Sequence, residues 1–444
     1  MSSITRTPLV AALRSTTSSA RAQALAGLDA WFDTLRAPGG YGGPVVHWWR
    51  HSLLYAGTGL DWRYEGIITG YLSLWRCSGE ARWLAKAKRA GDDLCAGQCG
   101  DSHYAASAFE INPASGGTPH EPGCDAALLE LARALHAAGD PAWPTYAAAA
   151  EHNIQTFIIG QLWSEPMAAV RDNPFGAAFV PNKACTAAEA LFLLAEIRSD
   201  AEIAERYALP TLQRVCAYQV RGGVYDGAIV QNSFGEQRVE KYLPIYIARC
   251  VPGLLAAYRF TGAACWADAA LRALAFIGRH LSAEGHLPTV IYPDGSVNLW
   301  PSWIAPLGDV LRAADMLRPL GGKVDALSVE QRILAWQSPG GGVPTAVGFA
   351  AQHGGRPGRM LDFRDVLPVA GWCDKAFRAL AARCESSLPV ATSESYETPC
   401  QMLGQLCTFM ETPERIELRR GRRTRYRWLK GQPWAEAAPE FWLP

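Results

Sequence analysis

The chain has 444 residues, which is enough for two or three domains or for one large closed repeat architecture. Hydrophobic residues make up 49% of it and charged residues 19%, with 42 basic and 42 acidic side chains. This composition excludes a disordered polyelectrolyte, and the balanced charge predicts no general affinity for nucleic acid. No apolar run approaches the roughly 18 residues that cross a bilayer, so we expect a soluble, cytoplasmic protein without a membrane span. Residues 1–28 contain no acid and weakly resemble an organelle transit segment.

Twelve cysteines are scattered through apolar stretches without the density of a disulfide scaffold, which favours reduced core residues. The sequence has no His-Glu-x-x-His motif, no paired Cys-x-x-Cys framework, no Walker-type phosphate loop and no Gly-x-Ser-x-Gly elbow. Cys95, Cys99 and His103 follow one another at intervals of four, which is a weak metal signal. We therefore predict no metal and no cofactor.

Helical periodicity dominates the chain after a first helix expected at residues 20–35. The later helical segments come in pairs, in which the first member is apolar nearly all round and the second carries charge on one face. The pairs are 62–77 with 80–96, 120–138 with 141–160, 183–197 with 200–220, 240–262 with 264–282, 301–319 with 326–337, and 371–384 with 395–410.

Landmarks at the start of each first helix recur at intervals of 56, 62, 58, 61 and 72 residues; they are Glu65, Glu121, Lys183, Lys241, Ser302 and Asp374. A repeat of this length has room for two helices and short Gly-rich connections, and the connections are expected to form short strands and turns. The apolar first helices predict an inner ring, and the amphipathic second helices predict an outer ring.

Six such hairpins resemble the all-α (α/α)6 toroid of many glycoside hydrolases, polysaccharide lyases and sugar epimerases. A related toroid occurs in terpene cyclases and prenyltransferases. The resemblance is one of architecture and covers about residues 60–410. It implies three parts: an N-terminal segment at 1–60, a catalytic toroid at 61–411 and a basic extension at 412–444.

In a toroid the inner helices start at one rim, so the loops that precede them converge on one mouth. Aromatic residues recur at these starts, and their faces can stack on sugar rings. Ordinary helix packing explains them about equally well. The four tryptophans at these starts are Trp62, Trp300, Trp303 and Trp372.

Acids also gather at the predicted mouth, where the common alternative is a helix cap. Glu240 is the first choice for a general acid because Lys241 and Tyr242 follow it. Glu121 or Asp226 would be its base or nucleophile, although a turn explains the Asp-Gly at 226–227 more simply. Glu65 and Asp374 are assigned to substrate binding.

Cations at the mouth suggest an anionic ligand. Lys183, Lys241 and Lys375 occupy the same place in three repeats, where a lysine opposes the helix dipole at a cost of about 0.3–1 kcal/mol. An equally good explanation is that these lysines form ion pairs with neighbouring acids. With His120 and Asn182, these lysines predict a site for a carboxylated sugar such as a uronate, or for phosphate or sulfate.

These residues favour hydrolysis of an acidic, uronate-containing oligo- or polysaccharide by carboxylate acid and base catalysis. The first alternative is a polysaccharide lyase or uronate epimerase, in which Tyr242 or His120 removes a proton and Asn182 with Lys183 neutralises the carboxylate. The others are a terpene cyclase or prenyl-binding toroid, and a non-catalytic scaffold. The oligomeric state is left open.

The basic run from Arg415 to Lys430 follows the toroid and contains six arginines between residues 419 and 427. Such a run can bind RNA or an acidic surface. The simpler interpretation is a β-hairpin with its tip at 420–422, whose charges protect a sheet edge from aggregation.

Overall fold

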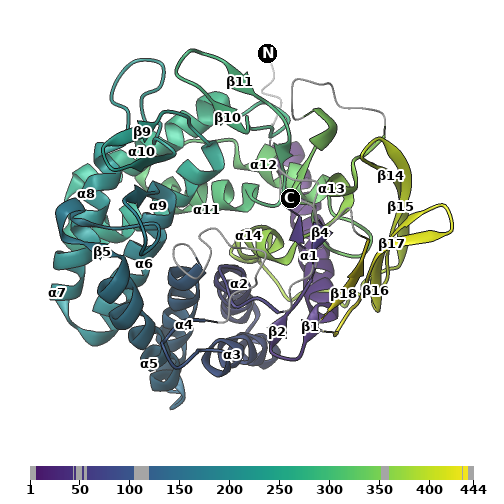
Figure 1. Cartoon of the computed structure of the whole chain (residues 1–444), viewed down its shortest axis with the longest axis horizontal. Helices are drawn as coiled ribbons and strands as arrows, with labels where there is room; N and C mark the ends of the chain where they lie inside the picture. Colours follow the sequence, from purple (N-terminus) through teal and green to yellow (C-terminus); the bar gives the residue numbers. More distant parts are fainter. Residues whose placement is uncertain are drawn as a thin grey trace.

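The computed structural model describes residues 7–43, 45–46, 53–54, 58–104, 120–351, 360–432 and 434–438. Six helices form an inner ring in which each packs on the next and the last packs on the first (Figure 1). These helices are α2 (Arg63–Ser78), α4 (His120–Ala137), α6 (Pro181–Arg198), α9 (Pro244–Thr261), α11 (Leu307–Leu317) and α14 (Ala370–Ala381). The predicted all-α (α/α)6 toroid is confirmed.

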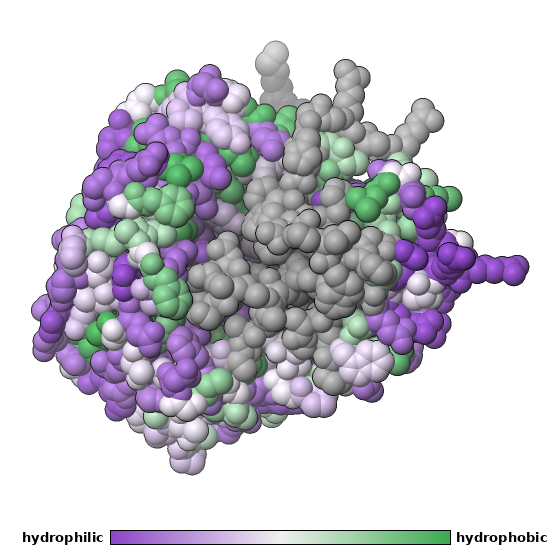
Figure 2. Space-filling view, in the orientation of Figure 1, coloured by the Kyte–Doolittle hydropathy of each residue, from purple (hydrophilic) through white to green (hydrophobic). Residues whose placement is uncertain are grey.

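An outer layer surrounds this ring, and the outer wall is largely hydrophilic where Figure 2 shows it. Its helices alternate in sequence with the inner ones, and one of them is built from three short pieces. They are α3 (Ala81–Ala96), α5 (Trp143–Asn153) continued by the π-helix η1 (Ile154–Leu162), α7 (Ala201–Ile203) with η3 (Ala204–Ala208) and α8 (Leu209–Ala217), α10 (Ala264–His280), and α12 (Ala326–Ala335).

The sixth outer position is filled by α1 (Thr7–Thr34), from the start of the chain. This helix packs on α14 and α12, and Phe32 contacts Phe377 of α14 with ring centres 5.4 Å apart. Asp29 accepts a hydrogen bond from Tyr71 of α2, which ties the same helix to the neighbouring hairpin. The toroid is therefore closed by joining the two ends of the helical region.

The outer helix predicted at residues 395–410 is wrong, because the segment forms strands β14 (Tyr396–Met402) and β15 (Gln405–Glu411). Pro399 would break a helix there, whereas the hairpin accommodates it at the sheet edge. Leu403 and Gly404 both have positive φ, at 50° and 74°, which is the geometry of a tight two-residue hairpin turn. Cys400 and Cys407 face each other across the pair and are buried.

These strands belong to a five-stranded antiparallel sheet with β16 (Arg415–Arg420), β17 (Arg423–Leu429) and β18 (Ala435–Ala437). The sheet thus crosses the predicted boundary at residue 411. Glu411 is buried and accepts hydrogen bonds of 2.8 Å from Trp31 Nε1, 3.0 Å from Tyr396 Oη and 2.9 Å from Lys430 Nζ. This carboxylate joins the sheet to α1.

Short elements connect the helices and line the ends of the ring. The described strands are β1 (Arg36–Ala37), β2 (Gly40–Tyr41), β3 (Val45–Val46), β4 (Leu53–Leu54), β5 (Trp163–Ser164), β6 (Ala169–Val170), β7 (Ala178–Phe179), β8 (Asn232–Phe234), β9 (Gln237–Val239), β10 (Val290–Ile291), β11 (Val297–Asn298), β12 (Ser302–Trp303) and β13 (Ala346–Val347). Single turns of helix are η2 (Glu165–Met167), η4 (Arg318–Leu320), η5 (Phe349–Ala351) and α13 (Phe363–Val366). Among the helices described, none combines the length and apolar character that a membrane crossing needs.

Candidate functional site

The first turns of the inner helices share one end of the toroid, which we call the mouth. Three of the four predicted tryptophans meet there and come from α2, α14 and β12. The ring centres of Trp62 and Trp372 lie 5.7 Å apart, and those of Trp372 and Trp303 lie 5.9 Å apart. We call these three residues the aromatic arc. Trp303 is fully buried, whereas Trp62 and Trp372 keep part of their faces open.

Trp62 stands between the two neighbouring inner helices. Its Nε1 donates a 2.5 Å hydrogen bond to the carbonyl of Gly371 at the start of α14. On its other side, a Cβ added to Gly123 of α4 would approach the Trp62 Cα to 3.0 Å, so glycine lets α4 come this close. The fourth tryptophan, Trp300, lies apart from the arc and packs over Gly348.

An ionic network fills the centre of the ring below the arc. Both carboxylate oxygens of Glu65 form ion pairs. The N···O distances are 2.6 Å to Arg249, 3.2 Å to Arg312 and 2.5 Å to Arg378. Burial alone would raise the pKa of Glu65, but the three guanidinium charges outweigh it and hold the pKa below its usual range. Glu65 therefore remains ionised and anchors four inner helices.

Asp374 and Lys375 connect this network to the arc. Lys375 Nζ donates a 2.6 Å hydrogen bond to Asp374 Oδ2 and lies 5.9 Å from the ring centre of Trp62. Asp374 is fully buried, and burial raises its pKa to about 6 despite the nearby cations of Lys375 and Arg378. Within the described chain, its Oδ1 has no hydrogen-bond partner. This carboxyl can exchange a proton near neutral pH.

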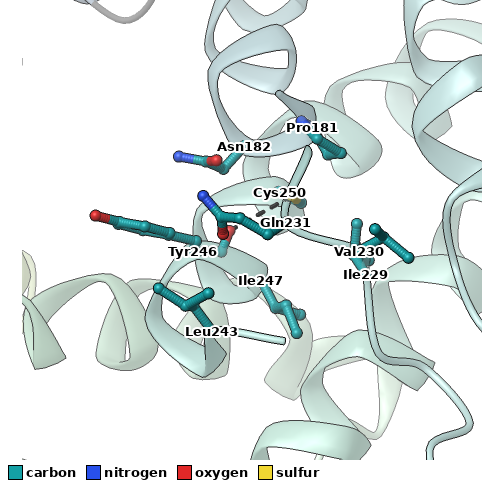
Figure 3. A pocket seen from close by; sticks show the side chains of 9 residues that line it. All are labelled: Pro181, Asn182, Ile229, Val230, Gln231, Leu243, Tyr246, Ile247 and Cys250. Carbon is teal, nitrogen blue, oxygen red and sulfur yellow. Dashed lines mark hydrogen bonds between the residues drawn. The ribbon is translucent and has the colours of Figure 1, made fainter. Parts of the chain in front are cut away.

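A small, open pocket lies between the first turns of α6 and α9 (Figure 3). The amides of Asn182 and Gln231 and the hydroxyl of Tyr246 project on the same side of it. Neither amide forms a side-chain hydrogen bond to another described residue. Tyr246 also packs against the buried cluster that contains Trp303, so the pocket and the arc form one wall of the mouth.

Glu121 lies in the first turn of α4 and is buried. It accepts hydrogen bonds of 2.7 Å from Asn153 and 3.3 Å from the Tyr104 backbone, and it lies 3.1 Å from His103 Nδ1. Burial raises the pKa of Glu121, and the hydrogen bond to Glu121 raises the pKa of His103. The His103 side chain is 23% exposed, so this pair can pass a proton between a buried carboxyl and an accessible ring.

One turn further along α4, Asp125 is also buried and accepts a 2.8 Å hydrogen bond from Tyr104 Oη. Burial raises the pKa of Asp125 well above its usual range, and the charge of Glu121 adds to this effect.

Three other predicted catalytic residues, Glu240, Asp226 and Tyr242, form no hydrogen bond or ion pair with Glu121 or Asp374. Glu240 is exposed after β9 and forms no hydrogen bond or ion pair with any residue that the structure describes. Asp226 accepts a 2.8 Å hydrogen bond from the Gly222 backbone and so stabilises a turn, as the simpler interpretation predicted. Tyr242 is buried against Phe276 and Tyr225, and burial raises its pKa.

The predicted cations are mostly paired with acids. Lys183 Nζ lies 2.7 Å from Asp172, and Lys375 is bound to Asp374, because a buried ammonium needs a compensating charge. Lys241 is half-buried and forms no ion pair with a described residue. His120 begins α4, and its side chain lies outside the described residues.

Several residues of the mouth escaped the sequence analysis. Gln231 and Tyr246 lie in unremarkable segments, so only the fold brings them to Asn182. His103 was considered only with Cys95 and Cys99 as a weak metal site, but the described residues include no group of three or more potential ligands arranged for a metal. The arginines of the network could have been noticed, because Arg249 interrupts an otherwise apolar helix.

No protein-family model matches the sequence, and no curated protein matches it. Solved structures do match. An unsaturated glucuronyl hydrolase specific for heparin is 13% identical, with a TM-score of 0.59 over 82% of this chain and 95% of that one. Cellobiose 2-epimerase from Bacillus thermoamylovorans is 12% identical, with a TM-score of 0.60 over 83% of this chain and 99% of that one.

A third similar structure is an inactive variant of an α-1,6-mannanase of Salegentibacter sp. in complex with α-1,6-mannotriose. It is 13% identical, with a TM-score of 0.53 over 82% of this chain and 98% of that one. This chain therefore shares the (α/α)6 toroid with carbohydrate-active enzymes. At this identity the likeness establishes the fold, and the chemistry has to be argued from the site itself.

Proposed function

We propose that this protein is a carbohydrate-active enzyme that hydrolyses a glycosidic bond in an acidic, uronate-containing oligosaccharide. The observation that carries the proposal is the position of Trp62 between α4 and α14, each of which holds a buried carboxyl with a raised pKa, Glu121 and Asp374. A sugar ring stacked on Trp62 would lie between the two helices that carry these carboxyl groups. Glycosidic hydrolysis requires such a pair of carboxyl groups.

Asp374 is the proposed general acid. Its pKa of about 6 leaves it partly protonated near neutral pH, and efficient acid catalysis needs a pKa close to the working pH. Glu121 with His103 is the proposed base that activates water. Asn182 and Gln231 offer amide donors and acceptors to sugar hydroxyls, and Lys375 offers a positive charge to a uronate. These polar groups support a sugar rather than a prenyl chain in the mouth.

The test is a panel of oligosaccharides that end in a uronate or an unsaturated uronate, with neutral mannan oligosaccharides and cellobiose as comparisons. New reducing ends should form from the uronate substrates. Asp374→Asn and Glu121→Gln should each lower kcat by about 10²–10⁴-fold, because positioned proton transfer typically contributes that much. Absence of cleavage across the whole panel, with correctly folded protein, would refute hydrolysis.

A second candidate is a sugar epimerase, which the pairing of His103 with Glu121 favours. A half-exposed imidazole oriented by a buried carboxylate is suited to removing a proton from carbon. The similarity in fold to cellobiose 2-epimerase adds support. Incubation of the saturated substrates in deuterium oxide separates the two reactions, because epimerisation places deuterium on a sugar carbon and hydrolysis of a saturated glycoside does not. His103→Gln should abolish that incorporation.

A further inference from the structure

Arginines line the outward face of the β16–β17 hairpin and also cover its tip. Ile416, Leu418, Tyr426 and Trp428 point into the core and are at most 1% exposed. The residues between them point outward, and they include Arg415 and Arg419 on β16 and Arg427 on β17. The β16–β17 hairpin adds arginines at its tip. We call the arginines on this outward face and at the exposed tip together the arginine face; they are Arg415, Arg419, Arg420, Arg422, Arg423, Arg425 and Arg427.

One end of the arginine face is organised around Glu417. This carboxylate is 1% exposed and accepts hydrogen bonds of 2.6 Å from Arg419 Nε and 2.8 Å from Arg427 Nε, with Arg415 Nε at 3.5 Å. Burial would raise the pKa of Glu417, but these hydrogen bonds and charges lower it. One acid thus fixes three guanidinium groups and neutralises one charge, so the cluster stays positive.

The other end, the hairpin tip, has no acid. Arg420 and Arg423 lie directly opposite each other across the two strands, and Arg422 lies in the turn between them. All three are exposed, and none forms an ion pair with a described residue. Like charges placed directly opposite on a sheet repel each other, so the tip has a local electrostatic cost that a bound anion would remove. The hydrophilic projection at the right edge of Figure 2 includes this hairpin.

We propose that the arginine face binds an acidic polysaccharide outside the mouth. The exposed row of guanidinium groups matches a polymer with regularly spaced carboxylates, and guanidinium binds carboxylate in two-pronged geometry. The choice of polysaccharide over other polyanions rests on the proposed function.

Nucleic acid is the less suitable occupant because single-stranded binding normally adds aromatic side chains on which bases stack. Tyr426 and Trp428 are fully buried, so the tip offers no aromatic platform. Trp434 is 53% exposed, but the next residue, Ala435, pairs with Trp428, which places it toward the opposite end of β17.

The experiment measures binding of a fluorescently labelled polygalacturonate oligomer to the full chain over a range of salt concentrations. Serine replaces all three tip arginines in one variant, R420S/R422S/R423S. This variant should bind about tenfold more weakly at low salt. Its affinity should also depend less steeply on salt, because a complex with fewer arginine contacts releases fewer counterions when it forms. A control variant with the same change in net charge replaces exposed arginines of the toroid, namely Arg206, Arg259 and Arg318.

The control should bind like the wild type. Equal weakening in both variants would show a general charge effect and overturn the proposal, as would failure of the wild-type protein to bind the polyuronate. Tighter binding of a single-stranded RNA of similar charge would also overturn it. Cleavage of a short uronate substrate should be unchanged in the tip variant. If binding is tip-dependent and no sugar is cleaved, the proposed hydrolysis fails while the binding surface stands.

Discussion

Lys375 lies between Asp374 and Trp62, with its Nζ 2.6 Å from the carboxylate and 5.9 Å from the centre of the indole ring. The ammonium group thus joins the fully buried acid of α14 to the aromatic residue that begins α2. A carboxyl that exchanges its proton near pH 6 is thereby held beside the proposed sugar platform. This arrangement makes the protonation of Asp374 accessible to measurement.

Replacing Asp374 with asparagine should change how stability depends on pH. Burial raises the pKa of Asp374 from 3.8 to about 6, so its favourable contribution is complete below pH 3.8 and is lost as the pH rises through 6. Between pH 4 and pH 7 the stability difference between wild type and Asp374→Asn should therefore change by roughly 3 kcal/mol, in favour of the variant at higher pH. Urea denaturation measures it, with Asp268→Asn on the exposed face of α10 for comparison.

Glu65→Gln should destabilise the toroid by about 3–5 kcal/mol, because it removes the shared counter-charge of the buried Arg249 and Arg378 and of the partly buried Arg312. The matched control is Glu196→Gln, whose ion pair with Arg133 at 3.3 Å is exposed and should contribute at most about 1 kcal/mol. Both values come from chemical denaturation monitored by circular dichroism. A loss below 1 kcal/mol for Glu65→Gln would contradict the central role given to this carboxylate.

Trp62→Leu should weaken substrate binding because it removes the indole face and the hydrogen bond to Gly371. An increase in KM or Kd of about threefold to tenfold is expected from the loss of aromatic stacking. Trp75→Leu is the control, since Trp75 is half-buried on the same helix but near the end away from the mouth. Equal effects of the two changes would show that Trp62 has only a packing role.

Glu121→Gln should lower the pKa of His103, because the hydrogen bond to the carboxylate is the main cause of its elevation. The titration of the His103 ring proton, followed by NMR, reports this shift directly. Asn153 and the Tyr104 backbone can still donate to the glutamine carbonyl, so the local fold should persist. An unchanged His103 titration would exclude the proposed proton sharing.

Glu240→Gln should alter both stability and turnover very little. The side chain is exposed and has no described partner, and surface changes of this kind usually lie within about 0.5 kcal/mol. Thermal unfolding and a rate assay on the active substrate provide the measurement. A loss of a hundredfold in turnover would restore Glu240 as the general acid that the sequence suggested.

The sequence by itself determined the helical repeat. The first helices carry apolar residues on all sides, as in the buried part of α6. Such a helix can bury this surface only by packing against neighbours on both sides, so the pattern predicts a closed inner ring. The tryptophans at the helix starts followed from the same periodicity, because every repeat begins at the same rim. The two-residue turn at Leu403 and Gly404 separates two strands where the periodicity predicted one helix, and glycine readily adopts the positive φ that such a turn needs.

Only the tertiary structure decided which helix closes the ring and which polar residues meet. The closing helix α1 comes from the opposite end of the chain and packs on α14. A local sequence pattern does not predict contact with a helix more than 300 residues away. The same applies to His103 with Glu121 and to Gln231 with Asn182, since the side-chain contacts depend on helix rotation and loop path. Glu240 shows the converse: its neighbours in sequence suggested chemistry, but its side chain is exposed and forms no hydrogen bond or ion pair with a described residue. Sequence spacing fixes the repeat because burial is periodic, whereas the site depends on long-range geometry that spacing does not encode.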